Sequence, residues 1–518
     1  MKLNSTPGLH VDETNYMNEV ISKVNFGTDI HGLKNPIYFA SVWGQGQSIL
    51  YAWIIVPVIK IFGFSLFMFR LPMAILTLTA IIAIVCSLYL SSPNKALPFL
   101  VTLSLVTTPW FLVSGRWVLD ANVSPIFVIL GLINFYLSTL EHPIKTKYYF
   151  LVLSSVFIAL SAYGYVASWI YLPFLIITMA LTTILKKWLS KKEVILWGIL
   201  IFILVLPLMV FAFRVNIQHT NKFSKFLIFD LPYLQANRVS SLISFKGSLF
   251  KNSLMNIFSG TKQILTGSDK LPQNSSLPYG AILPFMLIFA IIGSLGKKEL
   301  FSKNEIKFRI IILESLFTFI PGLMIIKPNY NHWNFLWFPL AILTGFGLYI
   351  VFNSIGKVGK LILITIPILV FGTFTFNNYL GIGNQKTVFN ASSGSFANTQ
   401  NINSMMDKYY SNNNLYIENL SGNFPIFRLV QHPINDSQYL KVQNKNRRIP
   451  YKIISAPTNR YGYLRDINNI AKSRKGDLAM VYRQNLGTYS KPLSNKSEWK
   501  FIKNAYFNHY PVMFFQKK

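Results

Sequence analysis

The feature that most constrains this chain is a series of apolar segments, each close to the length that a helix needs to cross a lipid bilayer. Such a helix takes roughly 20 mostly apolar residues. About ten segments of the sequence have this character, so we expect an all-α polytopic membrane protein. The segments cover residues 68–90, 97–113, 123–140, 148–165, 168–186, 194–213, 280–296, 310–327, 333–353 and 361–376.

Composition supports this class and argues against others. Of the 518 residues, 52% are hydrophobic and only 13% are charged, a balance typical of polytopic membrane proteins. The net charge of +31 is compatible with nucleic acid, but the basic residues are divided between short loops and a polar C-terminal region, and no nucleic-acid module is present. We therefore expect no nucleic-acid partner. The single cysteine, Cys86, excludes a disulfide framework and a cysteine metal site.

A further apolar segment, 48–64, decides the topology. It is shorter than the others and contains Pro57 and Lys60, which favours a juxtamembrane helix at the outer interface over a membrane span. Lysine-rich loops favour the cytoplasmic side. Counting helices back from those loops then puts a first external loop, 1–67, and a long external loop, 214–279, outside. The lysine-rich loops are 186–193, 296–309 and 356–360.

The chain changes character after residue 376. From there it is polar and net basic, and short β-like runs alternate with helical stretches. We expect a transmembrane domain over 1–376 and a small extracytoplasmic α/β domain over 377–518. The β-like runs are 414–420, 451–456, 477–483 and 510–516, and the helical stretches are 402–410 and 462–474.

Acidic residues are scarce, with 18 in the chain, and three of those at the predicted outer face are candidates for a site. Asp12 and Glu13 precede a predicted amphipathic helix, and Asp120 stands at the outer end of a membrane helix. Carboxylates at a membrane edge are costly and tend to be functional. Asp12 and Asp120 together could provide a general base, a site for a divalent metal ion, or both. The alternative is that Asp12 and Glu13 cap a helix and Asp120 is a helix-end residue.

Basic residues also collect at this face, where outer loops usually avoid them. A phosphate is the partner that suits them best, because arginine offers its oxygens a bidentate fork. The alternative is contact with lipid headgroups, and for the histidine at 332 a helix-capping role. The candidate phosphate-binding residues are Arg70, Arg116, Arg214, His219 and His332.

The order of these elements resembles a known group. The Asp12-Glu13 pair is followed by "NPIYFASVWGQGQSILYAWIIVPVIKIFGFSLFMFRLP" and then by "TTPWFLVSGRWVLDANVSPIFVILG". This order is similar to that of GT-C fold membrane glycosyltransferases of the protein O-mannosyltransferase and aminoarabinose-transferase-like superfamily. The segments "SLPYGAILPF" and "NHWNFLWFPLAILTGFGL" also resemble its bacterial members. The resemblance covers about 1–376.

The resemblance implies an activity: inverting transfer of a sugar from a polyprenyl-phosphate donor to a cell-envelope acceptor, which is a glycan, lipid or protein, at the outer face of the membrane. It further implies that Asp12 is the catalytic base with Glu13 beside it. Asp120 would be the second acidic residue, and Arg70 or Arg116 would contact the donor phosphate. Membrane lipids are the remaining expected partners.

The sequence departs from the family pattern at two places. The family has a membrane helix ahead of the acidic pair, whereas eleven residues precede Asp12 here, and His332 stands where relatives often carry arginine. An inactive relative of the transferases is therefore one alternative. A flippase of lipid-linked sugars is another, but it predicts paired repeats and polar residues near the bilayer midplane. A polysaccharide polymerase would share the basic cluster without needing the acidic pair.

Overall fold

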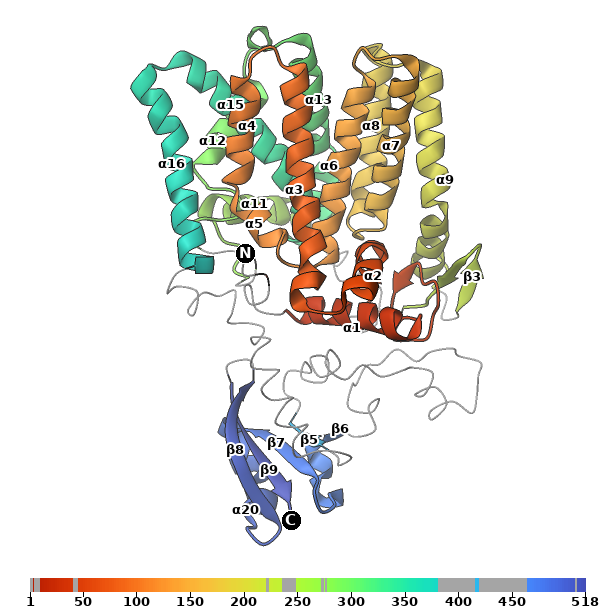
Figure 1. Cartoon of the computed structure of the whole chain (residues 1–518), viewed down its shortest axis with the longest axis vertical. Coiled ribbons are helices and arrows are strands. Elements are labelled where there is room, and N and C mark those ends of the chain that lie inside the picture. Colours follow the sequence, from red (N-terminus) through yellow and green to blue (C-terminus); the bar gives the residue numbers. More distant parts are fainter. Residues whose placement is uncertain are drawn as a thin grey trace.

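The computed structural model is a helical bundle with a separate small sheet beyond one of its ends (Figure 1). The structure describes residues 3, 10–40, 45–219, 223–234, 248–271, 274, 277–380, 415–418, 464–507 and 510–518. Within these residues, eight helical stretches are long and apolar enough to cross a membrane. They are α3 (Leu66–Ser91), α6 (Asp120–Ser138), α7 (Ile144–Ala162), α8 (Ser168–Leu185), α9 (Lys191–Asn216), α13 with α14 (Lys303–Phe317 and Ile320–Ile325), η2 with α15 (Asn334–Leu336 and Trp337–Ser354) and α16 (Lys357–Thr375).

Two of these helices form the centre of the bundle. In its most apolar window α6 is 89% buried and η2–α15 is 78% buried, compared with 11% for α16. Small residues allow helices in a membrane to approach closely. Gly347 of α15 shows this against α12 (Met286–Leu295), because a Cβ on Gly347 would lie 1.8 Å from the carbonyl oxygen of Phe289. Glycine is therefore required where these two helices cross.

Two of the ten expected spans are shorter than predicted. The segment 97–113 divides into α4 (Ala96–Val106) and α5 (Pro109–Ser114), because proline disfavours a helical conformation in the residue before it. In the segment 280–296 the helix α12 begins only at Met286, after a turn that contains Pro284. Together with the eight long stretches, these two short helices account for the ten predicted segments.

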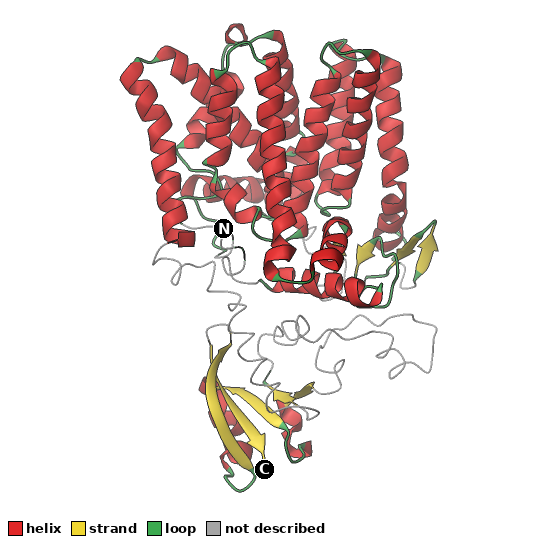
Figure 2. Ribbon diagram, viewed as in Figure 1, coloured by secondary structure: helices red, strands yellow, loops and turns green. Residues whose placement is uncertain are grey.

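Short helices gather at one end of the bundle, where Figure 2 shows them below the long ones. They include α1 (Val11–Phe26) and α2 (Leu50–Phe62). With 13 residues α2 is about 20 Å long, short of the roughly 30 Å of a bilayer core, so its juxtamembrane placement stays the prediction. Tyr16 of α1 accepts the N–H of Ala52 in α2, at 2.9 Å. Burial raises the pKa of Tyr16 well above its ordinary value, so this phenol stays neutral as it joins the helices.

A third helix at this end, α11 (Leu249–Thr266), lies in the segment 214–279, which was predicted as a long external loop and for which no helix was predicted. One face of α11 is held to the protein: Asn256 donates to the carbonyl of Met324 and Gln263 to that of Pro328. The other face exposes large apolar side chains, as in helices that lie in a membrane interface. These side chains are Phe250, Leu254, Met255, Ile257, Phe258 and Leu265.

The C-terminal sheet has five strands in the order β6-β5-β7-β9-β8. Strands β5, β7 and β9 lie where β-like runs predicted them, whereas the run 451–456 and the helical stretch 402–410 lie outside the described residues. The helix predicted over 462–474 is wrong in its first part, because β6 pairs there in parallel with β5. Strand β8 was not predicted. The strands are β5 (Leu415–Ile417), β6 (Leu464–Asp466), β7 (Leu478–Tyr482), β8 (Trp499–Phe507) and β9 (Tyr510–Lys517).

Candidate active site at one end of the bundle

The start of α1 presents two carboxylates. His10 is the N-cap, and its Nδ1 accepts the N–H of Asp12 at 3.3 Å. Asp12 and Glu13 therefore occupy the first turn, where the helix dipole favours negative charge. The N-cap contact is therefore made by His10, and not by Asp12 or Glu13 as the alternative interpretation has it. The two acidic side chains are left available for other contacts.

Adjacent residues of a helix point in different directions. Asp12 and Glu13 therefore lie in different environments, one partly exposed and one buried. The Asp12 side chain is 34% exposed, and the ring nitrogen Nδ1 of His10 lies 3.8 Å from its carboxylate. The Glu13 side chain is fully buried. Of the two, Asp12 is the carboxylate that a molecule at the surface can reach.

Glu13 is held by a buried ion pair with Arg70 of α3. Arg70 donates from Nε to Oε1 at 2.7 Å and from Nη2 to Oε2 at 2.5 Å, and it also donates from Nη1 to the carbonyl of Leu3. Oε1 of Glu13 further accepts the N–H of Val118 at 3.2 Å. A charge buried in a protein needs a partner of opposite charge that is hydrogen-bonded to it, and the two N–H groups of Arg70 provide this for Glu13. The pair thereby fixes α1 against α3 and against the segment that leads into α6.

Asp120 lies beside these residues as the first residue of α6. It is 4% exposed, and its carboxylate accepts the N–H of Ser48 at 3.4 Å and that of Ala121 at 2.9 Å. Strand β2 (Gln47–Ser48) joins it to α1, since Gln47 donates to the carbonyl of Asp12 at 3.4 Å. Asp12, Glu13 and Asp120 are thus brought to the same end of the bundle by contacts through β2 and Val118.

Asn334 completes this region, and sequence reasoning missed it. Its side chain accepts the indole N–H of Trp110 at 2.7 Å and donates to the carbonyl of Ala121 and the side chain of Asn122, at 2.8 and 2.9 Å. All of these atoms are buried. The signal in the sequence was a lone amide within the aromatic run "HWNFLWF". His332, two residues earlier, has Nδ1 at 2.8 Å from the carbonyl of Lys327.

The predicted phosphate-binding residues fall into two groups. Arg70 is engaged with Glu13, and Arg116 is 6% exposed, two residues before Val118. Arg214 lies in the last turn of α9, and His219 is exposed with a left-handed backbone (φ 47°). No described contact joins Arg214 or His219 to the three carboxylates. Phosphate binding by these residues stays a prediction.

The segment 214–279, predicted as an external loop, contacts the N-terminal segment through the hairpin of β3 (Ser224–Phe226) and β4 (Phe229–Leu231). The carboxylate of Asp230 accepts the N–H of Asn35 at 2.9 Å, and its backbone carbonyl accepts the N–H of Ile37 at 3.0 Å. Lys225 lies 3.7 Å from the same carboxylate. The hairpin is therefore packed against the chain between α1 and β1 (Tyr38–Phe39).

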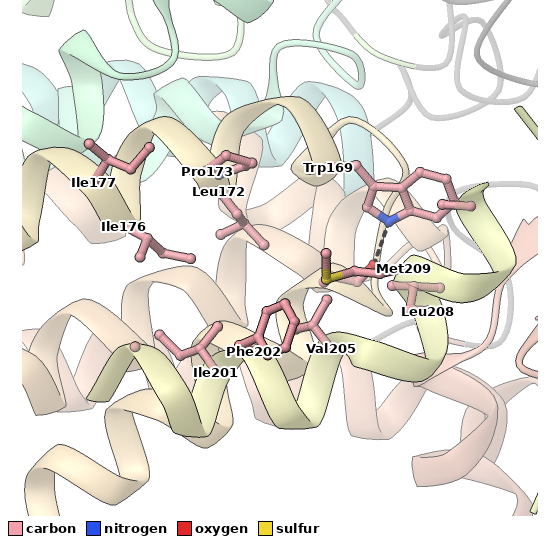
Figure 3. A pocket seen from close by; sticks show the side chains of 13 residues that line it. Trp169, Leu172, Pro173, Ile176, Ile177, Ile201, Phe202, Val205, Leu208 and Met209 are labelled. Atoms are coloured by element: carbon pink, nitrogen blue, oxygen red, sulfur yellow. Dashed lines mark hydrogen bonds between the residues drawn. The ribbon is translucent and has the colours of Figure 1, made fainter. Parts of the chain in front are cut away.

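An apolar groove of about 450 Å³ runs between α8 and α9 (Figure 3). Figure 3 shows Leu172 and Ile176 of α8 opposite Val205 of α9, with Trp169 at one end. That end lies beside β1, because the ring of Tyr38 is 6.0 Å from Trp169 and 5.2 Å from Phe211. The groove thus opens toward the end of the bundle that carries Asp12.

The described residues contain no group of three or more histidine, cysteine or acidic side chains that could hold a metal ion. For the divalent ion predicted at Asp12 and Asp120, the described chain offers two carboxylates, of which Asp120 is already bonded to backbone N–H groups. Divalent ions such as magnesium require about six oxygen ligands. These donors do not by themselves form a metal site.

Comparison with known proteins shows the fold. The chain aligns with the crystal structure of ArnT from Cupriavidus metallidurans in the apo state, with a TM-score of 0.56 over 97% of this chain and 93% of that one at 13% identity. The ArnT structure bound to undecaprenyl phosphate matches with the same TM-score at 12% identity. The apo oligosaccharyltransferase of Archaeoglobus fulgidus matches with a TM-score of 0.50 at 12% identity, over 96% of this chain and 71% of that one.

These neighbours are GT-C fold membrane glycosyltransferases, so the predicted fold is confirmed. The chain is a multi-pass membrane protein of this fold, with a small C-terminal sheet. No protein-family model matches the sequence, and no curated protein is significantly similar to it.

Proposed function

We propose that the protein is a glycosyltransferase that moves a sugar from a polyprenyl-phosphate donor to a cell-envelope acceptor, with inversion. The fold likeness to ArnT supports the class, since one of the ArnT structures contains undecaprenyl phosphate. The observation that carries the proposal is the contrast at the start of α1: Asp12 is 34% exposed, whereas Glu13 beside it is buried against Arg70. The Asp12 carboxylate is accessible to an acceptor, and Glu13 beside it fixes the position of α1, the helix on which Asp12 lies.

Asp12 acts as the general base. An acceptor hydroxyl attacks the anomeric carbon of the donor sugar, the bond from that carbon to the phosphate oxygen breaks, and Asp12 takes the hydroxyl proton. The polyprenyl phosphate leaves with one more negative charge than it had as a diester. A positioned base contributes about 10²–10⁴-fold to the rate. A single displacement of this kind inverts the anomeric centre.

Glu13, Arg70 and Asp120 are positioning residues in this scheme. The ion pair anchors the first turn of α1, and Asp120 anchors β2, whose Gln47 donates to the backbone carbonyl of Asp12. Arg116 is the nearest remaining arginine in the sequence to Asp120, and it is our candidate for compensating the charge of the leaving phosphate. Fixed cations of this type lower the energy of a transition state in which negative charge develops.

The groove between α8 and α9 suits the isoprenoid tail of the donor. It is lined by apolar side chains, among them Leu172, Ile176 and Phe202, and its Trp169 end lies beside Tyr38. A tail lying there would present its phosphate toward the end of the bundle with Asp12. We assign this end to the outer face of the membrane, because the lysine-rich loops that favour the cytoplasm are at the other end.

A divalent ion bound at Asp12 and Asp120 would also neutralise phosphate charge. The oxygen ligands that the described residues offer are too few to support this metal-binding part of the prediction. No step of the proposed reaction depends on a metal ion.

The proposal is tested by Asp12→Asn, which keeps the shape of the side chain and removes the base. Cells that produce the variant at wild-type level should lose the glycan that a deletion strain lacks, as measured by mass spectrometry of cell-envelope glycans. Glu299→Gln is the matched control, since Glu299 is exposed in η1 (Lys298–Leu300) at the other end of the bundle. Normal glycans in Asp12→Asn cells would refute the proposal, as would equal losses in both variants.

A further inference from the structure

A second cavity lies at the end of the bundle opposite Asp12. It has a volume of about 980 Å³ and is bounded by the C-terminal ends of α3 and α6 and by the N-terminal ends of α7 and α13. We call it the Ser92 cavity. None of its lining residues belongs to the candidate active site. Its polar lining includes Ser91, Ser92, Asn134, His142, Lys303 and Lys307.

The lining changes from apolar to polar along the helices. Ala83 of α3 and Ile133 of α6 line the part nearer the middle of the bundle, and Ser91 and Ser92 line the end of α3. Eight residues of helix separate Ala83 from Ser91, which is about 12 Å. This gradient fits an amphiphile whose chain follows the helices and whose headgroup lies at the membrane surface.

The polar end favours an anion. Lys303 and Lys307 both line it, and they lie in the first turns of α13, whose N-terminus is the positive end of the helix dipole. Lys307 also donates to the carbonyl of Thr139 at 2.9 Å, which holds its ammonium group at the cavity wall. Glu141 is the acidic residue of the lining, so two lysines face one carboxylate.

Ser92 points to a ligand independently of the charges. It is 2% exposed, and within the described part of the chain its hydroxyl has no hydrogen-bond partner. A buried hydroxyl without a partner is destabilising, because it has given up its hydrogen bonds to water. A ligand oxygen inside the cavity would remove that cost.

We propose that the Ser92 cavity binds the headgroup of an anionic phospholipid. Lys303, Lys307 and the hydroxyl of Ser92 contact the phosphate oxygens, and the acyl chain lies along Ala83, Ile133 and Leu137. A soluble phosphate ester shares the headgroup chemistry, but it leaves the apolar part of the lining unused. This site is separate from the proposed transfer of sugar and does not depend on it.

Cys86 allows a direct test, because it lines the cavity, is exposed, and is the single cysteine of the sequence. The full-length protein in detergent is reacted with N-ethylmaleimide, and the rate of labelling is followed by intact mass spectrometry. Bound lipid covers the thiol and slows labelling by the factor 1 + [L]/Kd, or about threefold at twice Kd. The probe is dioctanoyl phosphatidylglycerol, compared with glycerol 3-phosphate and with uncharged dioctanoylglycerol.

Slower labelling with phosphatidylglycerol, and not with dioctanoylglycerol, supports the proposal. If glycerol 3-phosphate slows the reaction as well, phosphate recognition is supported and the headgroup alone is sufficient for binding. No slowing by phosphatidylglycerol, or equal slowing by dioctanoylglycerol, overturns the proposal.

Variants separate the site from general attraction to charged lipid. Lys303→Gln should weaken the apparent affinity about fivefold, the factor that corresponds to roughly 1 kcal/mol per lysine at a lipid surface. Lys298→Gln is the matched control, an exposed lysine in the same connection that does not line the cavity. Ser92→Ala tests the hydroxyl without changing a charge and should also weaken binding. Equal affinities for Lys303→Gln and Lys298→Gln would overturn the proposal.

Discussion

The two ends of the bundle are built from different kinds of contact. At the end with Asp12, side-chain hydrogen bonds join residues 57, 72 and 212 positions apart, namely Arg70 with Glu13, Ser48 with Asp120 and Asn334 with Asn122. At the other end α9 and α13 each begin with a capping box between residues three positions apart, from Ser190 to Glu193 and from Ser302 to Glu305. The first set of contacts depends on tertiary structure, whereas the two capping boxes depend on local sequence.

The difference has a consequence for both stability and function. A local cap affects one helix end, and its loss leaves the rest of the bundle in register. A buried contact between distant segments affects every element that it joins. We therefore expect substitutions at the Asp12 end to alter stability more than those at the capped end.

The largest expected effect on stability is that of Arg70→Met, which leaves the Glu13 carboxylate buried without its cation. Breaking one partner of a buried pair costs about 3–5 kcal/mol, and the loss should appear as a lower unfolding midpoint of the purified protein. Glu13→Leu combined with Arg70→Met removes both charges and should recover much of the stability. A single variant as stable as the wild type would contradict the burial of the pair.

Asn334→Ala should have the next largest effect. It leaves the indole N–H of Trp110 and the side chain of Asn122 without a shared partner, at about 1–3 kcal/mol for a buried polar group. Thermal unfolding compares it with Asn353→Ala, an exposed asparagine of α15, the helix that directly follows η2. If both variants unfold at the same temperature, Asn334 does not hold this end together.

At the capped end Ser302→Ala should cost about 1 kcal/mol, the usual effect of losing an N-cap hydroxyl. Sugar transfer should be unchanged, because α13 begins at the end remote from Asp12. The measurement pairs the unfolding midpoint with the glycan profile of cells that carry the variant. Loss of the glycan with normal protein levels would show that the two ends are coupled, and it would contradict the prediction that this cap acts locally.

The smallest effect is expected for Lys225→Gln in the β3–β4 hairpin. Lys225 is 72% exposed and lies 3.7 Å from Asp230, so the pair should contribute less than about 1 kcal/mol and weaken further in salt. Asp230→Ala should cost more, because it also removes the oxygen that accepts the N–H of Asn35. Unfolding midpoints at low and high salt distinguish the two. Equal losses would show that the ion pair, and not the backbone contact, holds the hairpin.

The same contrast explains what the sequence could predict. Apolar runs long enough to cross a bilayer are visible in the sequence, and each of the eight long apolar stretches of the described residues overlaps a segment predicted as a span. The shortness of the 48–64 run was also visible, and α2 has 13 residues. The break at Thr107–Pro109 was visible as a proline but was read as part of a span. The order of motifs then led to the GT-C fold, which the structural comparison confirms.

The site was less predictable because its geometry depends on distant residues. Asp12 and Glu13 are neighbours in sequence. The contact of Arg70 with α1 determines that Glu13 is the buried one. Asn334 belongs to the site region through its hydrogen bond to the carbonyl of Ala121 in α6, and no local sequence pattern predicts this contact. Helix α11 was missed because its apolar residues follow one face and never form a continuous run.

We also expect helix α11 to mark where the bilayer surface meets the protein. Its outward face carries phenylalanine and leucine side chains that require hydrocarbon, while Asn256 and Gln263 tie its inward face to the loop before Trp333. The ring of Trp333 fills the space beside Gly260, where a Cβ would come within 1.8 Å of it. Because the Trp333 ring leaves α11 no room to shift toward the bundle, we expect this helix to fix the depth at which the protein lies in a bilayer.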